Sequence, residues 1–269
     1  MTPFAEVIGD PITHSKSPLI HGFWLDALGI AAEYRAAHVK AEALAHYFAE
    51  RRDDPDWRGC NITVPHKVAA LDHVPDPGGV RSSIGAINTV FRDESGSIAG
   101  TNTDAAGFWS PISALDLKGK PVTIIGAGGA ARAVLFALSR IGVGPVTILN
   151  RSPLKAAGLL ATFGLKGQIA ALDAKLPPAA LLVNASTLGM AGQPPLQLDL
   201  SPLAEDTIVY DLVYAPLQTE LMRSAEERGL DTIDGLEMLI GQAALAFEMF
   251  FGAEPPRDRD EELRERLTA

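Results

Sequence analysis

The pattern of hydrophobic and polar residues is most regular in the middle of the chain, where it predicts a strand, a turn and a helix. Four β-favouring residues, Val122–Ile125, run directly into a glycine-rich turn. The following segment, 130–139, places its apolar side chains at the spacing of one helix face: Ala130, Val134, Leu135 and Leu138. The rest of the chain is organised around this strand–turn–helix unit.

Alternating strand and helix patterns on either side of this unit predict an α/β fold. Ahead of it, strands are expected at 6–9, 33–38 and 60–64, and helices at 19–28 and 41–52. Two β-favouring segments flank the turn Asp93–Gly96 and predict a hairpin. After the central unit, strands are expected at 145–149, 180–183 and 207–212, and a helix at 218–228.

The last predicted helix, 236–251, has a nearly continuous apolar side, formed by Leu239, Ile240, Ala243, Phe247, Phe250 and Phe251. We expect it to pack back on the N-terminal region and to complete that domain after an inserted cofactor domain. Three polar residues in it, Glu237, Gln242 and Glu248, exclude a membrane span. The mostly charged tail from Glu254 is expected to be a solvated end.

Composition narrows the class of protein. A chain of 269 residues with 47% hydrophobic residues suits two modest globular domains. The net charge of −10 argues against nucleic acid and anionic membranes as partners. A single cysteine, Cys60, and an N-terminus without a basic and apolar leader are typical of a cytoplasmic protein. His38 and His46 lack metal-ligand spacing, and no metal site is expected.

The glycine turn of the central unit has the spacing of a dinucleotide fingerprint. Gly126 permits the tight turn, Gly128 lets the backbone approach a pyrophosphate, and Ala131 lets the helix lie close to the sheet. An ordinary tight turn between a strand and a helix is the alternative. Because the pattern follows a strand and opens a helix, we favour a bound dinucleotide, with its diphosphate at the helix N-terminus.

The next predicted strand indicates which dinucleotide. An NAD enzyme is expected to carry an acid at its end, about 20 residues after the glycines, where it binds the ribose 2′-hydroxyl. Here the strand ends in Asn150-Arg151-Ser152, with Lys155 close behind, and no acid is present. The two cations suit a 2′-phosphate, so the predicted cofactor is NADP.

Four other polar positions are candidate functional residues. Ser15 and Ser17 precede a helix and are either N-caps or hydroxyl donors to a ligand carboxylate, and taken alone they favour capping. Lys67 follows a strand and Pro65, which we expect to start a helix; it is either a solvated lysine or part of a site at the strand's carboxyl end. Asp104 is either a helix N-cap or a functional acid.

Eight motifs, in order along nearly the whole chain, give it a resemblance to the shikimate dehydrogenase family. They are Ser-x-Ser-Pro from Ser15, Asn-x-Thr-x-Pro-x-Lys from Asn61, Gly-Ala-x-Asn-Thr from Gly85, Asn-Thr-Asp ending at Asp104, the fingerprint at 126–130, Asn-Arg-Ser from Asn150, Asp-x-x-Tyr-x-Pro from Asp211, and Gly-x-x-Met-Leu-x-x-Gln from Gly235. Each motif is common by itself, but eight of them in sequence are highly specific.

The resemblance implies two α/β domains and NADP-linked interconversion of 3-dehydroshikimate and shikimate, a step towards aromatic amino acids. The expected substrate domain is 1–104 with 236–269, and the expected Rossmann-type NADP domain is 105–235. The implied catalytic pair is Lys67 and Asp104. The implied substrate-binding residues are Ser15, Ser17, Thr63, Asn88, Tyr214 and Gln242. The implied cofactor-binding residues are Gly126, Ala127, Gly128, Gly129, Ala130, Asn150, Arg151, Ser152, Lys155, Leu212 and Gly235.

The residue chemistry agrees with this function. Reduction of a ketone needs a proton at oxygen as well as a hydride at carbon, and a lysine held by a carboxylate can exchange that proton. Serine and tyrosine hydroxyls suit a carboxylate, which reverses the capping preference for Ser15 and Ser17, and amides such as Asn88 and Gln242 suit a polyol. The expected partner is a small-molecule substrate, and the protein is expected to be a monomer or a homodimer.

Two alternatives stay open. A quinate or mixed quinate/shikimate dehydrogenase that uses NAD would carry an acid near Asn150 and a threonine in place of Ser17. A non-catalytic NADP-binding regulatory module on the same fold would be expected to have lost Lys67 or Asp104. The sequence shows none of these changes.

Overall fold

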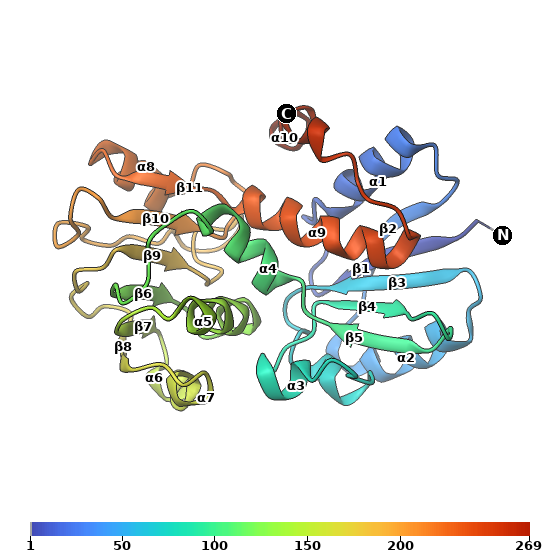
Figure 1. The fold of residues 1–269 in the computed structure, drawn as a ribbon, viewed down its shortest axis with the longest axis horizontal. Helices are drawn as coiled ribbons and strands as arrows, with labels where there is room; N and C mark the ends of the chain where they lie inside the picture. Colours follow the sequence, from blue (N-terminus) through green and yellow to red (C-terminus); the bar gives the residue numbers. More distant parts are fainter. Residues whose placement is uncertain (1) are drawn as a thin grey trace. The chain divides into compact units, whose positions relative to one another are not determined.

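The computed structural model describes residues 2–269 and contains two compact units, each built on its own β-sheet (Figure 1). Unit 1 runs to Thr103 and resumes at Ile240, whereas unit 2 is the continuous segment Asp104–Leu239. The long helix α9 (Gly235–Phe251) contributes residues to both units. The predicted α/β class is confirmed.

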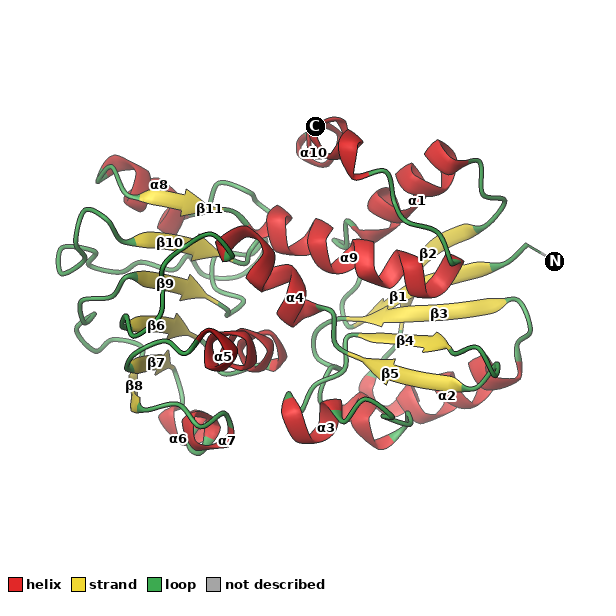
Figure 2. Cartoon of the chain, in the orientation of Figure 1, coloured by secondary structure: helices red, strands yellow, loops and turns green. Residues whose placement is uncertain are grey.

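Unit 1 has a five-stranded sheet in the order β2-β1-β3-β4-β5 (Figure 2). Its strands are β1 (Phe4–Gly9), β2 (Glu33–His38), β3 (Trp57–Ile62), β4 (Thr89–Arg92) and β5 (Ile98–Thr101). The first three are parallel, with Ile8 paired to both Ala37 and Ile62. Their carboxyl ends therefore meet at one edge of the sheet. Strands β4 and β5 form the predicted hairpin.

Aromatic residues form the core on one side of this sheet. Helix α1 (Ser17–Leu28) places His21 against Tyr34 of β2, with ring centroids 3.9 Å apart and planes 2° from parallel. Phe247 of α9 meets Trp24 edge to face, at 5.5 Å between centroids. The predicted packing of this helix on the N-terminal elements is thus confirmed. Unit 1 also contains η1 (Ala41–Ala43), α2 (Leu44–Asp53), η2 (Ala69–Asp72) and α3 (Val80–Ser83).

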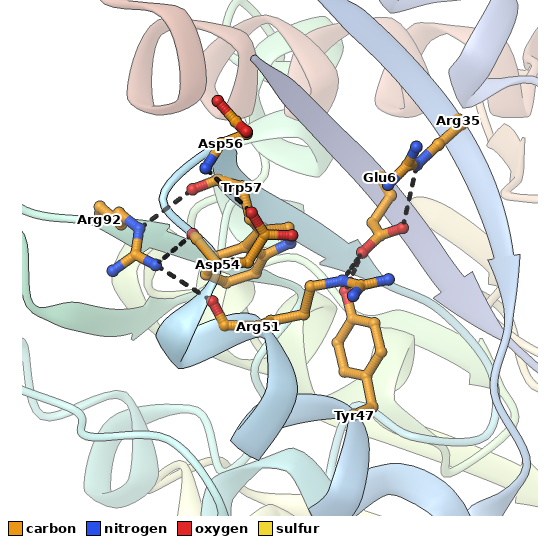
Figure 3. Close-up of polar contacts among 8 residues, drawn as sticks. All are labelled: Glu6, Arg35, Tyr47, Arg51, Asp54, Asp56, Trp57 and Arg92. Atoms are coloured by element: carbon orange, nitrogen blue, oxygen red, sulfur yellow. Dashed lines mark hydrogen bonds and ion pairs between the residues drawn. The ribbon is translucent and has the colours of Figure 1, made fainter. Parts of the chain in front are cut away.

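Two arginine clusters attach α2 to the sheet (Figure 3). The carboxylate of Glu6, on β1 and 1% exposed, accepts hydrogen bonds from the Tyr47 hydroxyl at 2.9 Å and from Arg51 Nε at 2.5 Å. The Arg92 guanidinium donates to the carbonyl oxygens of Arg51, Arg52, Asp54 and Trp57. A cation at a helix C-terminus satisfies carbonyl groups that have no partner within the helix.

Unit 2 has a six-stranded parallel sheet in the order β11-β10-β9-β6-β7-β8 (Figure 2). Its strands are β6 (Val122–Ile125), β7 (Val146–Asn150), β8 (Gly167–Ala171), β9 (Leu181–Asn184), β10 (Ile208–Asp211) and β11 (Asp231–Ile233). Every residue of β6 and β9 is buried, as expected for parallel strands covered on both faces. The chain leaves β6 towards β7 and β8 on one side, and later returns to β9 on the other side of β6.

Helices of unit 2 include α4 (Asp104–Trp109), α5 (Gly129–Ile141), α6 (Pro153–Ala156), α7 (Leu159–Thr162) and α8 (Glu220–Glu227). A 3-10 turn, η3 (Ser110–Ile112), follows α4. Of the four apolar residues predicted on one face of this helix, Val134, Leu135 and Leu138 are fully buried in one cluster with Ile124 and Ile148, whereas Ala130 is half-buried. The strand–turn–helix prediction for this region is confirmed.

Some predictions made from the pattern were wrong. Residues 63–68 form turns rather than a helix after Pro65, and the 3-10 helix η2 starts only at Ala69. The charged tail is not a solvated end: after η4 (Arg257–Arg259) it forms α10 (Asp260–Thr268), with Leu263 and Leu267 buried. Strands β8 and β11 were not predicted. Within the part of the chain that is described, no helix has the length and apolarity that crossing a membrane requires.

Candidate active site

The segments that follow β1 and β3, at the carboxyl edge of the unit 1 sheet, hold four of the predicted residues. The loops that follow β1 and β3 are joined by backbone hydrogen bonds from Thr63 N to Ile8 O (2.9 Å) and from Asp10 N to Val64 O (3.1 Å). Thr63 and Lys67, both half-buried, lie in the turn after β3. Ser15 and Ser17 lie in the chain that follows β1.

The two serines have different environments. Lys16 is the N-cap of α1 and makes no capping hydrogen bond with its side chain, and Ser17 is the first helical residue, so the capping role considered for Ser17 was wrong. Ser15 Oγ accepts a hydrogen bond from Ser17 N at 3.3 Å, which orders the turn. Ser17 itself is only 5% exposed, although it is polar. A buried hydroxyl at a strand-end loop can bind a ligand oxygen.

A buried polar network centred on Asn88 lies beside this edge. Asn88 Nδ2 donates to Thr103 Oγ1 (2.9 Å) and to Gln242 Oε1 (3.3 Å), and Asn88 Oδ1 accepts from Thr103 N (2.7 Å). Asn88 and Gln242, predicted as substrate-binding residues, are therefore neighbours although they are far apart in the chain. Both are buried, at 2% and 7% exposure.

The same network continues into the sheet. Asn61 Nδ2 donates to Thr89 Oγ1 at 3.1 Å, and Asn61 Oδ1 accepts from the Tyr34 hydroxyl at 2.6 Å. Thr89 Oγ1 in turn donates to Asn88 Oδ1 at 3.0 Å. Each amide thus has fixed donor and acceptor directions, which preorganises the group facing a polar ligand.

The predicted catalytic pair is Lys67 and Asp104. The Lys67 carbonyl accepts a hydrogen bond from Ile87 N at 2.7 Å, which joins its turn to the segment that leads to Asn88. Asp104 is the first residue of α4, is 4% exposed and directly follows Thr103 in the chain. A buried carboxylate of this kind needs a polar or charged partner.

In unit 2, the fingerprint turn follows β6, the strand from which the chain adds strands first on one side of the sheet and then on the other. Gly126 follows β6 with φ +103°, and a Cβ atom there would come within 3.0 Å of Ala185 O, so only glycine fits. Gly128 is the N-cap of α5 and has no side chain with which to cap the helix, and a Cβ atom at Gly128 would meet nothing within 4 Å. The N-terminus of α5 is thus open to an anion.

The adjacent strand ends hold the other predicted cofactor residues. Gly126 N donates to Leu149 O at 2.9 Å, so the fingerprint turn lies next to the end of β7 at Asn150. Asn150 Nδ2 donates to Ser152 O at 2.8 Å and shapes the turn that carries Arg151 and Lys155, both exposed. On the other side of β6, Leu212 N donates to Asn184 O at 3.0 Å.

Gly235 closes this edge of unit 2. A Cβ atom at Gly235 would come within 2.6 Å of the carbonyl oxygens of Leu212 and Val213, so the start of α9 needs glycine to approach this backbone. Tyr214, the predicted substrate-binding residue of unit 2, lies half-buried in the same loop. Burial raises the pKa of its hydroxyl.

The residues of this edge fit NADP. An open helix N-terminus after a glycine turn suits a diphosphate, and the switch point between β6 and β9 is where open α/β sheets bind nucleotides. Two exposed cations without an acid at the end of β7 suit a 2′-phosphate.

The sequence assigned no role to the side chain of Asp211, which lies at the same edge. The Asp211 carboxylate, fully buried, accepts from Asn184 Nδ2 (2.9 Å), Val213 N (3.0 Å) and Thr219 Oγ1 (2.6 Å). Burial raises the pKa of Asp211, while these hydrogen bonds oppose that rise. Asp211 belongs to a recognised motif, but nothing in the sequence connects it to Thr219.

Three models of known protein families match separate segments of the chain. A family model described as "Shikimate dehydrogenase substrate binding domain" matches residues 7–90. One described as "Shikimate / quinate 5-dehydrogenase" matches 111–186, and one described as "Shikimate 5'-dehydrogenase C-terminal domain" matches 235–263.

Individual proteins are similar over their whole length. A shikimate dehydrogenase (NADP(+)) of Sphingopyxis alaskensis is 72% identical over 268 residues, with 100% of this chain and 98% of that protein covered. The shikimate 5-dehydrogenase of Thermus thermophilus, solved with NADP(H) and shikimate, has a TM-score of 0.84 and 39% identity, covering 99% of this chain and 100% of that one. The quinate dehydrogenase of Corynebacterium glutamicum, solved with NAD, also has a TM-score of 0.84, at 30% identity, covering 98% and 99%.

Proposed function

Because the chain belongs to the shikimate dehydrogenase family, we propose that it is an NADP-dependent shikimate dehydrogenase, which reduces 3-dehydroshikimate to shikimate reversibly. This step leads towards the aromatic amino acids. Two observations together carry the proposal: the N-terminus of α5 is open to an anion at the carboxyl edge of the unit 2 sheet, and unit 1 holds a preorganised polar network around Asn88.

NADP is held by the carboxyl edge of the unit 2 sheet in this proposal. The backbone at 126–130 faces the diphosphate, and the turn of Asn150, Arg151, Ser152 and Lys155 faces the 2′-phosphate. Leu212 and Gly235 border the remaining part of the dinucleotide. When bound, the cofactor supplies the hydride-transferring group of an alcohol–ketone reaction.

Unit 1 binds most of the substrate. The hydroxyls of Ser15 and Ser17, together with Tyr214, bind the substrate carboxylate, and Thr63, Asn88 and Gln242 bind its ring hydroxyls. The amides are suited to this role because each offers a donor and an acceptor to a polyol. Their directions are set by the network described above, and Asn88, whose amide already bonds Thr103, Thr89 and Gln242, exchanges one of these contacts for a substrate hydroxyl on binding.

Lys67 and Asp104 move the proton. During oxidation, Lys67 accepts the proton from the reacting hydroxyl, and during reduction it returns a proton to the ketone oxygen. Asp104 orients the lysine and binds a neighbouring substrate hydroxyl. A positioned acid/base of this kind contributes about 10²–10⁴-fold to a rate.

One assay tests this function. The purified protein is incubated with shikimate or quinate, each with NADP or NAD, and reduced cofactor is followed by its absorbance. We expect the highest kcat/KM for shikimate with NADP, because Arg151 and Lys155 replace the acid expected for NAD. A preference for quinate with NAD would favour the alternative enzyme, and no turnover with any pair would favour a regulatory NADP-binding protein.

The cellular setting belongs to the same proposal. The single cysteine, Cys60, is buried, and burial raises the pKa of its thiol. A lone, unreactive thiol is compatible with a reducing cytoplasm. We propose that the enzyme acts there as a monomer or a homodimer.

A further inference from the structure

We propose that His66 is a positioning residue for Lys67, an inference that rests on the proposed catalytic role of Lys67. His66 occupies a position that the family motif Asn-x-Thr-x-Pro-x-Lys leaves unspecified. Its side chain is nevertheless 1% exposed, and its ring is hydrogen-bonded to the backbone of Val39, the residue that follows β2.

The contact fixes both the ring and its tautomer. His66 Nε2 lies 2.6 Å from the carbonyl oxygen of Val39. Because a carbonyl oxygen only accepts, Nε2 must carry the hydrogen and donate it. The ring is thus tied to the residue that follows β2, whereas the backbone of His66 belongs to the turn after β3.

The position of Val39 is itself fixed by a hydrogen bond to the sheet and by burial. Val39 N donates to Gly9 O at 3.2 Å, at the end of β1, and the side chain of Val39 is 6% exposed. Strand β1 lies between β2 and β3 in the sheet. The His66 ring therefore reaches past the end of β1 and connects the two strands that flank it.

The turn that carries Lys67 is held on both sides of the lysine. Upstream, His66 N donates to Thr63 O at 3.0 Å and Ala70 N donates to His66 O at 2.9 Å, in addition to the ring contact. Downstream, the Lys67 carbonyl accepts from Ile87 N at 2.7 Å. Residues 63–68 form no helix, so regular helical hydrogen bonds do not order this segment. The hydrogen bonds named above hold its backbone instead, and they thereby fix the direction of Lys67. A displacement of about 1 Å at a reacting group can lower a rate about 10²-fold.

Three variants test the role of the ring hydrogen bond. His66→Phe keeps the planar ring but loses the donor, whereas His66→Gln places an amide N–H near the position of Nε2. We expect His66→Phe to lower kcat for shikimate oxidation by about 10- to 100-fold, with KM for shikimate unchanged, and His66→Gln to restore most of the rate. His73→Phe is the matched control, since its ring stacks near Phe48, with centroids 6.2 Å apart, and should leave kcat unchanged.

Amide hydrogen exchange gives a readout that does not depend on activity. Exchange at residues 66–70 should be faster in His66→Phe than in the wild type, and should return towards the wild-type rate in His66→Gln. If His66→Phe does not fold, His66→Asn serves in its place, because its shorter amide does not reach Val39 O. Its kcat should then be low, whereas kcat of His66→Gln should be close to that of the wild type.

The outcomes distinguish a failure of the positioning role of His66 from a failure of the proposed function. A wild-type kcat in His66→Phe, or a kcat in His66→Gln as low as in His66→Phe, would overturn the positioning role. A wild-type protein without shikimate oxidation would instead contradict the proposed function, and the exchange rates would still decide whether His66 orders the turn.

Discussion

At the scale of single residues, the two units use their polar side chains differently. In unit 1, Asn88 and Gln242 are held by each other and by Thr103, so their direction is set before a ligand arrives. In unit 2, Arg151 and Lys155 are exposed. Substitutions in unit 1 are thus expected to affect turnover and geometry, and those in the turn after β7 to affect cofactor choice.

The first prediction at this scale concerns Lys67. Lys67→Ala should lower kcat by about 10²–10⁴-fold and change KM for shikimate far less, because a proton-transfer group contributes mainly in the transition state. Asp104→Asn should lower kcat as well, and the double variant should be little worse than Lys67→Ala alone. Steady-state kinetics of the three variants measure this. A near-normal kcat in Lys67→Ala would end the acid/base assignment.

A second prediction concerns cofactor choice. Arg151→Ala should weaken NADP binding about 10- to 100-fold, since a charge-assisted hydrogen bond is worth about 1.5–3 kcal/mol, and should leave NAD binding almost unchanged. Titration calorimetry with both dinucleotides measures the difference. Equal losses for NADP and NAD would show that Arg151 does not bind the 2′-phosphate.

At the scale of elements, the pattern predicted those with a strong and continuous signal. The run Val122–Ile125, the glycine turn after it and the amphipathic helix behind it all lie where they were expected. The prediction failed where the signal is weak or contradictory: β11 has only three residues, and α10 is mostly charged, with just Leu263 and Leu267 buried. The site residues came from family motifs, but some of their partners lie too far away in sequence for any local pattern to connect them: Gln242 for Asn88, Val39 for His66 and Asn184 for Asp211.

The misjudged tail leads to a third prediction. Leu263, fully buried on α10, lies on a helix that packs against α1, and Arg259 and Arg266 lie over the ring of Phe23. Leu263→Ala should lower the free energy of unfolding by about 2–5 kcal/mol, the usual cost of a cavity at a buried leucine. Urea unfolding followed by tryptophan fluorescence measures it, with Glu265→Ala, an exposed position on the same helix, as the control. Equal stability of the two variants would mean that α10 adds nothing to unit 1.

For the whole molecule, stability should depend on pH through His21. Burial lowers the pKa of His21 from 6.5 to about 3. Between these values the unfolded chain binds a proton at His21 and the folded protein does not, so stability is full above pH 6.5 and falls as the pH falls towards 3. Lowering the pH from about 7 to about 5 should cost about 2 kcal/mol from this residue.

The variant His21→Phe isolates this contribution, because phenylalanine can keep the stacking on Tyr34 without a titrating group. Urea unfolding of both proteins from neutral pH to pH 5 gives the difference between their stabilities, in which other titrating groups cancel. The two pH profiles should converge towards acid if the variant is the less stable protein at neutral pH, or diverge if it is the more stable. Parallel profiles would show that His21 does not cause the loss.

The discontinuity of unit 1 also affects how the protein is made. On the ribosome, unit 2 is complete once Leu239 has emerged, whereas unit 1 lacks Phe247 and Phe250 until the rest of α9 has also emerged. Until then, the side of His21 and Trp24 that these rings cover is exposed to water, although all five strands of the unit 1 sheet have already been synthesised. The nascent chain therefore presents an uncovered aromatic surface for longer than a protein with two consecutive domains would, and it is at this stage that chaperone binding and aggregation compete most strongly with folding.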